Sequence, residues 1–285
     1  MSSTAAARRL DQINRHVTVL PCVAGAPAQV TTAAPSMLGK RILLTGGGSG
    51  IGRGVALAFA RAGGAVVIAG RRKDALLATA AELSADSAGR IVPYCTDIAD
   101  AAAVAELVAF ATDTLGAVDI LVNNAGINIP ARGLAELSVP DWTRVVNVNL
   151  NGTFHVIHSL LPAMRTRKEG VIINVTSIAG RTATTLAGAA YCASKFGMNA
   201  LGDAINLEEH THGIRCTNIC PGEVATELLD KRAHPPSQET RALMLQPEDV
   251  AAAAIMVAAL PPRAHVPTVV LTGKTTIERG GVPMW

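Results

Sequence analysis

Short apolar runs and longer alanine-rich stretches alternate along the chain from residue 40 onward. The short runs have the length of strands, are rich in Val, Ile and Leu, and are continuously apolar rather than alternating with polar positions. Continuous apolarity predicts strands that are covered on both faces, as in a parallel sheet. The predicted strands are residues 41–45, 65–69, 91–95, 120–123, 171–176, 215–219 and 268–272.

Stretches of helical length separate these strands. Their start signals include Asp100 before an alanine-rich run, Ser138 three residues ahead of Asp141, and Pro247 in a first turn. Repeated β-α-β units predict an α/β fold: a single-domain, Rossmann-type, doubly wound parallel sheet of about seven strands with helices on both faces, whose ligands bind beyond the carboxyl ends of the strands. The predicted helices are residues 50–62, 73–84, 101–114, 141–164, 191–210 and 247–260.

The start of the chain differs in composition from the rest. Ala, Ser, Thr and Pro dominate residues 1–36, and Asp11 is their one acidic residue. We therefore expect a disordered N-terminal extension over residues 1–36 and a folded domain over residues 37–285. Two other interpretations stay open: a mitochondrial-type transit peptide, which is rich in Arg and Ser and poor in acids, and upstream sequence translated ahead of a functional start at Met37.

Composition and charge narrow the classes of function. The 285 residues are 49% hydrophobic and 16% charged, which excludes a disordered chain and allows a large aliphatic core. A formal net charge of +3 is too balanced to indicate a polyanionic partner. The longest apolar run, residues 250–262, is shorter than the roughly 18 to 20 residues that a membrane span needs. We expect neither a nucleic-acid partner nor a membrane partner.

The cysteines and histidines indicate no metal site. The five cysteines are scattered without a C-x-x-C pair, which argues against disulfides and zinc and favours a reducing, cytoplasmic location. Histidine pairs occur in two predicted helices, but nothing supplies a third ligand. The residues concerned are Cys22, Cys95, Cys192, Cys216, Cys220, His155, His158, His210 and His212.

A glycine-rich turn joins the first predicted strand to the first predicted helix. It reads Thr45-Gly46-Gly47-Gly48-Ser49-Gly50-Ile51-Gly52. Such a turn lets the backbone approach a pyrophosphate, and the helix N-terminus directs N–H groups and partial positive charge toward it. The alternative is an ordinary tight turn, but the flanking strand and helix favour dinucleotide binding.

The glycine spacing, T-G-x-x-x-G-x-G, resembles that of the short-chain dehydrogenase/reductase family. The resemblance continues through further motifs in the family's order and spans nearly all of residues 38–272. It implies a nicotinamide-dependent oxidoreductase. The motifs are Asn123-Asn124-Ala125-Gly126, Asn149, Ser177, Tyr191-Cys192-Ala193-Ser194-Lys195 and Pro221-Gly222-Glu223-Val224-Ala225-Thr226.

Tyr191, one of two tyrosines in the chain, stands four residues before Lys195. On a helix this spacing places both side chains on one face. A phenol with its ordinary pKa near 10 is a poor base at neutral pH. The Lys195 ammonium, together with the positive nicotinamide of an oxidised cofactor, would favour the phenolate, and a pKa lower by about two to three requires roughly 3 to 4 kcal/mol. Tyr191 could then take a proton from an alcohol or give one to a carbonyl.

Two further residues complete the expected catalytic group. Ser177 ends a predicted strand at the ligand edge, where its hydroxyl can hydrogen-bond a substrate oxygen. The family resemblance implies the same role for Ser177, a second role for Lys195 in holding the nicotinamide ribose, and a water anchored by Asn149. Taken singly, Tyr191, Ser177 and Asn149 could each be ordinary packing, loop or helix residues; their joint register favours catalysis.

The end of the second predicted strand bears on the choice of cofactor. An acid there would bind the adenosine ribose, whereas Arg accommodates a 2'-phosphate. Gly70 is followed by Arg71 and Arg72 without an acid, which favours NADP(H) over NAD. Ser49 is a competing observation, because some NADP-preferring relatives carry a basic residue at that point. The expected cofactor-binding residues are Gly46, Gly48, Ser49, Gly50, Ile51, Gly52, Arg71, Arg72, Asp97, Ile98, Asn124, Ala125, Gly126, Tyr191, Lys195, Pro221, Gly222, Val224 and Thr226.

We therefore expect an NADP(H)-dependent oxidoreductase that interconverts a carbonyl and a secondary alcohol. An NAD-dependent alcohol dehydrogenase and a non-catalytic NADP(H)-binding sensor or scaffold are the alternatives. Residues 180–190 and a polar lid over residues 227–246 should set specificity, and the lid favours a small polar or hydroxy-acid-like substrate. The resemblance implies a homo-oligomer, tetramer before dimer, although the segment after Thr272 matches the family poorly.

Overall fold

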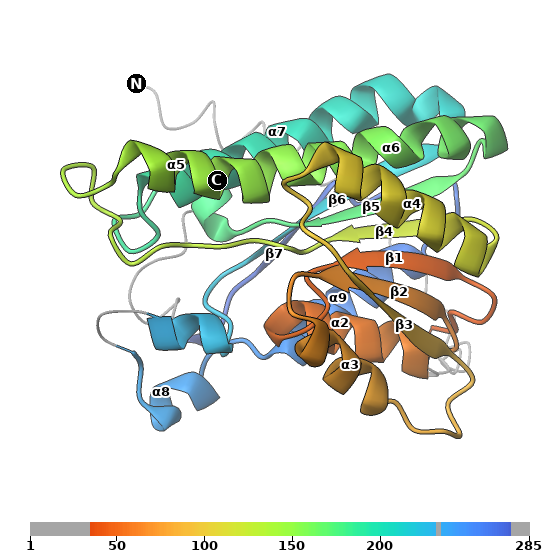
Figure 1. Ribbon diagram of the computed structural model, residues 1–285, viewed down its shortest axis with the longest axis horizontal. Coiled ribbons are helices and arrows are strands. Elements are labelled where there is room, and N and C mark those ends of the chain that lie inside the picture. The colour runs from red at the N-terminus through yellow and green to blue at the C-terminus, as the bar shows by residue number, and fades with distance from the viewer. Residues whose placement is uncertain (1–34, 232–234, 275–285) are drawn as a thin grey trace, which may run out of the picture. The chain divides into compact units, whose positions relative to one another are not determined.

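A parallel sheet of seven strands organises the described part of the chain (Figure 1). The structure is a computed structural model, and it describes residues 35–231 and 235–274. The strand order is β3-β2-β1-β4-β5-β6-β7, so the predicted fold class is confirmed. Each strand lies within two residues of its predicted ends. The strands are β1 (Arg41–Thr45), β2 (Ala65–Gly70), β3 (Arg90–Cys95), β4 (Ile120–Asn123), β5 (Gly170–Val175), β6 (Ile214–Pro221) and β7 (Thr268–Leu271).

Helices cover both faces of this sheet. Figure 1 shows α2, α3 and α9 on one face and α4, α6 and α7 on the other. None of the helices in residues 35–231 and 235–274 has the length and apolarity to cross a membrane. The α-helices are α2 (Gly50–Arg61), α3 (Lys73–Ala81), α4 (Ala101–Leu115), α5 (Val139–Val146), α6 (Gly152–Arg167), α7 (Ala189–Glu209), α8 (Gln238–Ala242) and α9 (Pro247–Ala259).

In β1 to β6, alternate residues belong to two separate hydrophobic layers. In β1, Ile42 and Leu44 belong to the layer beneath α2 and α9, whereas Leu43 belongs to the layer beneath α4 and α6. All three are fully buried. Because successive side chains of a strand point to opposite faces, this explains the continuous apolarity of the strands. The packing on both faces fixes the strand ends, from which the loops of the site extend.

Residues 141–164 are helical throughout, as predicted, but they do not form one regular α-helix. The chain forms α5, then a π-helical turn η2 (Asn147–Asn151), and only then α6. The Asn149 side chain is fully buried and exchanges two hydrogen bonds with the backbone of Ile127, at 2.8 and 3.0 Å. Gly152 lies against Ile98, where an added Cβ would be 2.8 Å from that side chain. The π turn, a type of irregularity often found at functional sites, therefore coincides with tertiary contacts that helical periodicity does not predict.

The expected lid contains structure of its own. It includes a 3-10 turn η5 (Glu227–Lys231) and α8, separated by residues outside the described part. Shorter 3-10 turns, η3 (Ile178–Gly180) and η4 (His210–His212), flank α7. The expectations for residues 1–34, for residues 232–234 of the lid and for the segment after residue 274 fall outside the described residues.

Candidate active site

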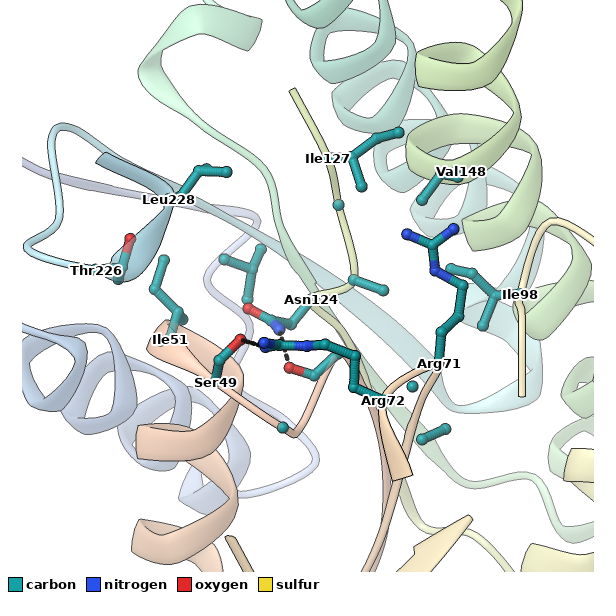
Figure 2. Close-up of a pocket in the computed structure, with 18 of the residues that line it drawn as sticks. Ser49, Ile51, Arg71, Arg72, Ile98, Asn124, Ile127, Val148, Thr226 and Leu228 are labelled. Atoms are coloured by element: carbon teal, nitrogen blue, oxygen red, sulfur yellow. Dashed lines mark hydrogen bonds between the residues drawn. The ribbon is translucent and has the colours of Figure 1, made fainter. Parts of the chain in front are cut away.

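A pocket of about 390 Å³ opens at the carboxyl edge of the sheet, within the usual size range of small-molecule sites (Figure 2). Its walls come from the loops that follow β1, β2, β3 and β4, the start of α7 and the turn η5. The structure brings most of the expected cofactor residues together there. Those lining the pocket are Gly46, Gly48, Ser49, Gly50, Ile51, Arg71, Arg72, Asp97, Ile98, Asn124, Ala125, Gly126, Tyr191, Lys195 and Thr226.

Four expected cofactor residues do not line this pocket: Gly52, Pro221, Gly222 and Val224. Gly52 supports the turn from behind, since a Cβ there would lie 2.1 Å from the carbonyl oxygen of Gly46. Val224 instead forms a β-bridge with Leu245 of the lid region.

The pocket also has lining residues that the sequence analysis did not single out, and all of them are close in sequence to residues that it did. They are Ala69, Gly70, Leu76, Thr96, Ile127, Val148, Val175, Thr176, Glu227 and Leu228.

The glycine turn has the backbone geometry that its sequence requires. Gly46 and Gly50 adopt φ values of +74° and +51°, a region that other residues rarely enter. At Gly46 a Cβ would also lie 2.7 Å from the Asn124 side-chain nitrogen. That nitrogen donates to the carbonyl oxygens of Thr45 and Gly46, each at 3.1 Å. The loop after β4 therefore holds the turn from one side.

The N-terminus of α2 faces this pocket, and the residues of the helix itself do little to satisfy its free N–H groups or to neutralise its partial positive charge. Ser49 is the N-cap residue, yet its hydroxyl makes no cap hydrogen bond, and the first turn contains no acidic residue. The hydroxyl instead accepts a hydrogen bond of 2.8 Å from Arg72 (Figure 2). Helix N-termini carry partial positive charge and directed N–H groups. The site therefore has the features of a phosphate site.

Two arginines add positive charge at the end of β2. The Arg71 guanidinium lies 3.6 Å from the Asp97 carboxylate, and both side chains are largely exposed. The Arg72 guanidinium bonds Ser49 across the mouth of the glycine turn. The chain here suits an anion such as a phosphate group, because guanidinium groups bind phosphate oxygens well.

Tyr191 and Lys195 lie together in the first turns of α7. The Lys195 ammonium is 5.7 Å from the centre of the Tyr191 ring, and Lys195 is only 3% exposed. It donates to the carbonyl oxygen of Val175 at 3.0 Å and contacts the Met198 sulfur at 3.3 Å. The Lys195 side chain is therefore almost completely buried at the wall of the pocket.

Ser177 and Asn149 lie close to this pair but do not line the pocket. The Ser177 hydroxyl accepts from the backbone N–H of Ala179 at 3.0 Å and is hydrogen-bonded to Tyr191. Asn149 donates at 3.0 Å to the hydroxyl of Ser194, which in turn donates to the Tyr191 carbonyl oxygen at 2.8 Å. The structure thus groups all four expected catalytic residues around the start of α7.

The environment of the pair sets the two pKa values in opposite directions. Burial raises the pKa of Tyr191 to about 12, opposed by its hydrogen bond with Ser177 and by the positive charge of Arg132. Burial lowers the pKa of Lys195 to about 8. The residues of the chain alone therefore favour the neutral phenol, and the lower pKa expected from the sequence would require the cofactor's charge as well.

The histidines and cysteines that the sequence analysis considered make packing and backbone contacts. His155 contacts the carbonyl oxygen of Ile98 at 3.2 Å, and Cys216 and Cys220 are fully buried thiols. Within residues 35–231 and 235–274, no group of three or more His, Cys, Asp or Glu side chains is placed to hold a metal ion.

Comparison of the sequence with known families adds an independent observation. Residues 40–236 match the family model described as short chain dehydrogenase. Glycine betaine reductase of Emericella nidulans is 38% identical over 218 residues, which make up 75% of this chain but only 17% of that protein. D-beta-hydroxybutyrate dehydrogenase of Rhizobium meliloti is 33% identical over 205 residues, or 72% of this chain and 78% of that enzyme.

Solved structures resemble this fold over most of its length. An alcohol dehydrogenase from Thermococcus sibiricus, complexed with 5-hydroxy-NADP, has a TM-score of 0.74 and 26% identity and covers 82% of this chain and 97% of its own. A 3-oxoacyl-[acyl-carrier protein] reductase of Brucella melitensis with bound NAD has a TM-score of 0.71 and 30% identity, covering 88% and 94%. Structures similar to this chain thus include complexes with either type of dinucleotide.

Proposed function

The chain belongs to the short-chain dehydrogenase/reductase family, and from this membership we propose that it is an NADP(H)-dependent oxidoreductase interconverting a carbonyl and a secondary alcohol. One observation carries the proposal: Tyr191 and Lys195 line the same pocket as the glycine turn. A proton-transferring side chain and a phosphate-binding backbone therefore share one cavity. A protein that only sensed the dinucleotide would have no use for a phenol at that place.

The residues divide the work between binding and proton transfer. The glycine turn and the start of α2 would hold the pyrophosphate, and Lys195 would hold the nicotinamide ribose. Bound NADP(H) supplies or accepts the hydride. Tyr191, with Ser177 beside it, would donate a proton to the carbonyl oxygen during reduction and remove it during oxidation. Asn149 would support this exchange through Ser194 and the start of α7.

The preference for NADP(H) rests on charge at the end of β2. Arg71 and Arg72 line the pocket, and no acidic residue follows the strand directly to bind a ribose hydroxyl. Asp97 lies within 3.6 Å of Arg71, so it offsets part of that charge without removing the two guanidinium groups. NAD-dependent alcohol oxidation is the second candidate, and the bound NAD of the Brucella reductase supports it.

The substrate we propose is small and polar, with hydroxy acids and their keto forms first. More than half of the residues in the lid over residues 227–246 are polar or charged, and Lys231 and Arg232 supply positive charge there that suits a carboxylate. The name of the Rhizobium relative, D-beta-hydroxybutyrate dehydrogenase, adds support from a similar sequence.

We also propose a cytoplasmic location and a homo-oligomer, with a tetramer favoured over a dimer. Large apolar side chains are exposed on adjoining helices, with Phe154 on α6 48% exposed and Phe196 on α7 42% exposed. Large apolar side chains exposed on the surface favour subunit contacts. Multi-angle light scattering of the purified full chain tests this: a monomer at micromolar concentration would contradict it.

A panel of ketones, keto acids, secondary alcohols and hydroxy acids tests the activity, with turnover followed by absorbance at 340 nm using each dinucleotide. We expect NADP(H) to support faster turnover than NAD(H). Tyr191→Phe should lower kcat by about 10³-fold, because general acid–base catalysis contributes about 10² to 10⁴, while NADPH affinity should change little. Cofactor binding without turnover on any substrate would favour the sensor, and full activity of Tyr191→Phe would refute the role of Tyr191.

A further inference from the structure

Two loops that flank Tyr191 are joined by side-chain hydrogen bonds. The loop after β4 contributes Asn128 and Arg132, and the segment between η3 and α7 contributes backbone carbonyl groups. Asn128 donates to the carbonyl oxygen of Ala187 at 3.0 Å. The Arg132 guanidinium donates to the carbonyl oxygen of Leu186 at 2.6 Å and, within its own loop, to that of Ile129 at 2.8 Å. Arg132 thus joins the loop after β4 to the segment immediately before α7.

The backbone of Arg132 also lies directly against the first residue before α7. Gly188 occupies the N-cap position of that helix with φ +81°, three residues ahead of Tyr191. A Cβ at Gly188 would be 2.6 Å from the Arg132 Cβ and 2.8 Å from its carbonyl oxygen. An approach this close leaves room only for glycine. The start of α7, and with it the phenol, is therefore placed against Arg132.

The charged groups around the phenol give Arg132 an electrostatic role as well. Burial and the neighbouring Cys192 thiol raise the pKa of Tyr191, while the Ser177 hydrogen bond and the charge of Arg132 lower it. Lys195, one turn further along α7, directs its ammonium to the Val175 carbonyl oxygen, 5.7 Å from the ring centre. In the chain alone, Arg132 is thus a cation that favours the phenolate, in addition to the Lys195 ammonium.

We propose that Arg132 is a positioning residue for Tyr191: its guanidinium joins the loop after β4 to the segment entering α7 and holds a positive charge near the phenol. The effect of Arg132 on catalysis rests on the proposed function. Its effect on the position and pKa of the Tyr191 phenol does not. Arg132 is outside the set of residues lining the cofactor pocket. Its replacement should therefore leave NADPH affinity within twofold.

Three variants separate the geometric from the electrostatic role. Arg132→Lys keeps the charge but loses the planar fork, Arg132→Gln keeps a donor but loses the charge, and Arg132→Met loses both. Arg144→Gln, at an exposed arginine of α5 whose carboxylate neighbour Asp141 is 4.0 Å away, is the matched control for loss of a charge. Each variant is first checked for its circular dichroism spectrum and NADPH affinity, so that misfolded protein is set aside.

The first measurement is the pH profile of kcat/KM for alcohol oxidation. Loss of a unit charge near a partly buried group is expected to move the pKa of that group by about 0.5 to 1. We expect the rising limb to shift by that amount to higher pH in Arg132→Gln and Arg132→Met, and to stay in place in Arg132→Lys and Arg144→Gln. We expect Arg132→Lys to lower kcat by about threefold to tenfold through the lost fork. An unchanged limb in both uncharged variants would overturn the proposal.

The second measurement needs no turnover. In a Tyr94→Phe background Tyr191 is the only tyrosine, and the Phe ring can still pack on Phe110, whose ring centre lies 4.6 Å from that of Tyr94. Stopped-flow pH jumps followed at 295 nm then record ionisation of Tyr191 before alkaline unfolding. Arg132→Gln should move this ionisation to higher pH, and Arg132→Lys should not. If neither moves it, Arg132 does not act on the phenol; if it moves but no substrate turns over, only the proposed function fails.

Discussion

The two edges of the sheet use their charged side chains differently. At the amino edge, most charged groups are bonded to one another or to backbone carbonyl oxygens. Arg41 binds the Asp119 carboxylate through its guanidinium at 2.9 Å and through its backbone N–H at 3.0 Å. Arg167 donates to the carbonyl oxygen of Val118 at 2.6 Å, and Arg215 to that of Leu260 at 2.7 Å. These groups join loops that precede the strands.

At the carboxyl edge, charged groups surround a pocket and are less tightly paired. Arg71 and Asp97 are 3.6 Å apart and largely exposed, and Arg72 bonds only a hydroxyl among the described contacts. Lys195 is buried without an acidic partner in the described structure, at a pKa of about 8. A buried, uncompensated cation costs folding free energy.

The size of a cavity does not distinguish the two edges. The amino edge has a pocket of about 860 Å³, larger than the one at the carboxyl edge. Three of its four lysines and arginines already have partners: Lys40 lies 3.7 Å from Glu169, and Arg167 and Arg215 bond backbone oxygens. The fourth, Lys168, is exposed to solvent, so its charge is not desolvated. A catalytic site is expected where charged groups are buried without a partner and so lower the free energy of unfolding. This criterion selects the carboxyl edge.

The largest effect on stability is expected from Arg41→Met at the amino edge. Asp119, whose side chain is 11% exposed, would keep its charge but lose its guanidinium partner, so the free energy of unfolding should fall by about 3 kcal/mol at pH 7. Arg41 holds the pKa of Asp119 below its ordinary value in the folded protein. That stabilisation exists above the ordinary pKa of about 3.8 and is lost as pH falls through the lower folded value, so the deficit should shrink below about pH 4.

Urea denaturation at pH 7 and at pH 3 measures this deficit and its decline. Arg53→Met is the matched control, because the Arg53 and Glu82 side chains are 45% and 36% exposed and such pairs contribute about 1 kcal/mol or less. Equal losses in the two variants would contradict the contrast between a structural, largely buried pair and an exposed one.

At the carboxyl edge, Lys195→Met should stabilise the fold while turnover is lost. A lysine pKa lowered from 10.5 to about 8 corresponds to about 3 kcal/mol at neutral pH, of which about 1 to 2 should be recovered after the lost hydrogen bonds. Between pH 8 and 10.5 the unfolded chain binds a proton that the folded wild type has released, so wild-type stability rises relative to the variant. The gain should therefore fade by pH 10.5.

Denaturant curves of the wild type and Lys195→Met at pH 7 and pH 10 give both differences. The difference between the unfolding free energies of the two proteins cancels the contributions of other groups that titrate in this range. If the variant is less stable at both values, burial of Lys195 carries no cost, and the contrast between the edges loses its energetic basis.

The smallest expected effect is on the dinucleotide. Arg71→Asp should weaken NADPH about tenfold and NADH much less, because a carboxylate would repel the 2'-phosphate. Stability should change by less than about 0.5 kcal/mol, as is usual for an exposed pair. Lys73→Asp, an identical change of charge two residues away at an exposed site outside the pocket, is the control for long-range repulsion. Equal weakening of both cofactors by Arg71→Asp would count against the assignment, and fluorescence titration measures it.

Local signals account for how well the strands and the pocket could be predicted. The seven strands were recognisable because burial on both faces requires continuous apolarity. The glycine turn was recognisable because Gly46 and Gly50 hold positive φ, a requirement visible in residue identity alone. The π turn at Asn149 was not, because it depends on bonds to Ile127, 22 residues away.

The sequence by itself determined the order of the elements, the edge at which a ligand binds and the residue types that surround it, since these follow from periodicity, glycine positions and spacing along single elements. Tertiary structure alone decided where side chains point and how strongly they are desolvated. It directed the Lys195 ammonium to Val175 and brought Arg132 to Leu186, 54 positions away. It also raised the pKa of Tyr191 by burial. Such properties arise from neighbours distant in sequence, which no local pattern specifies.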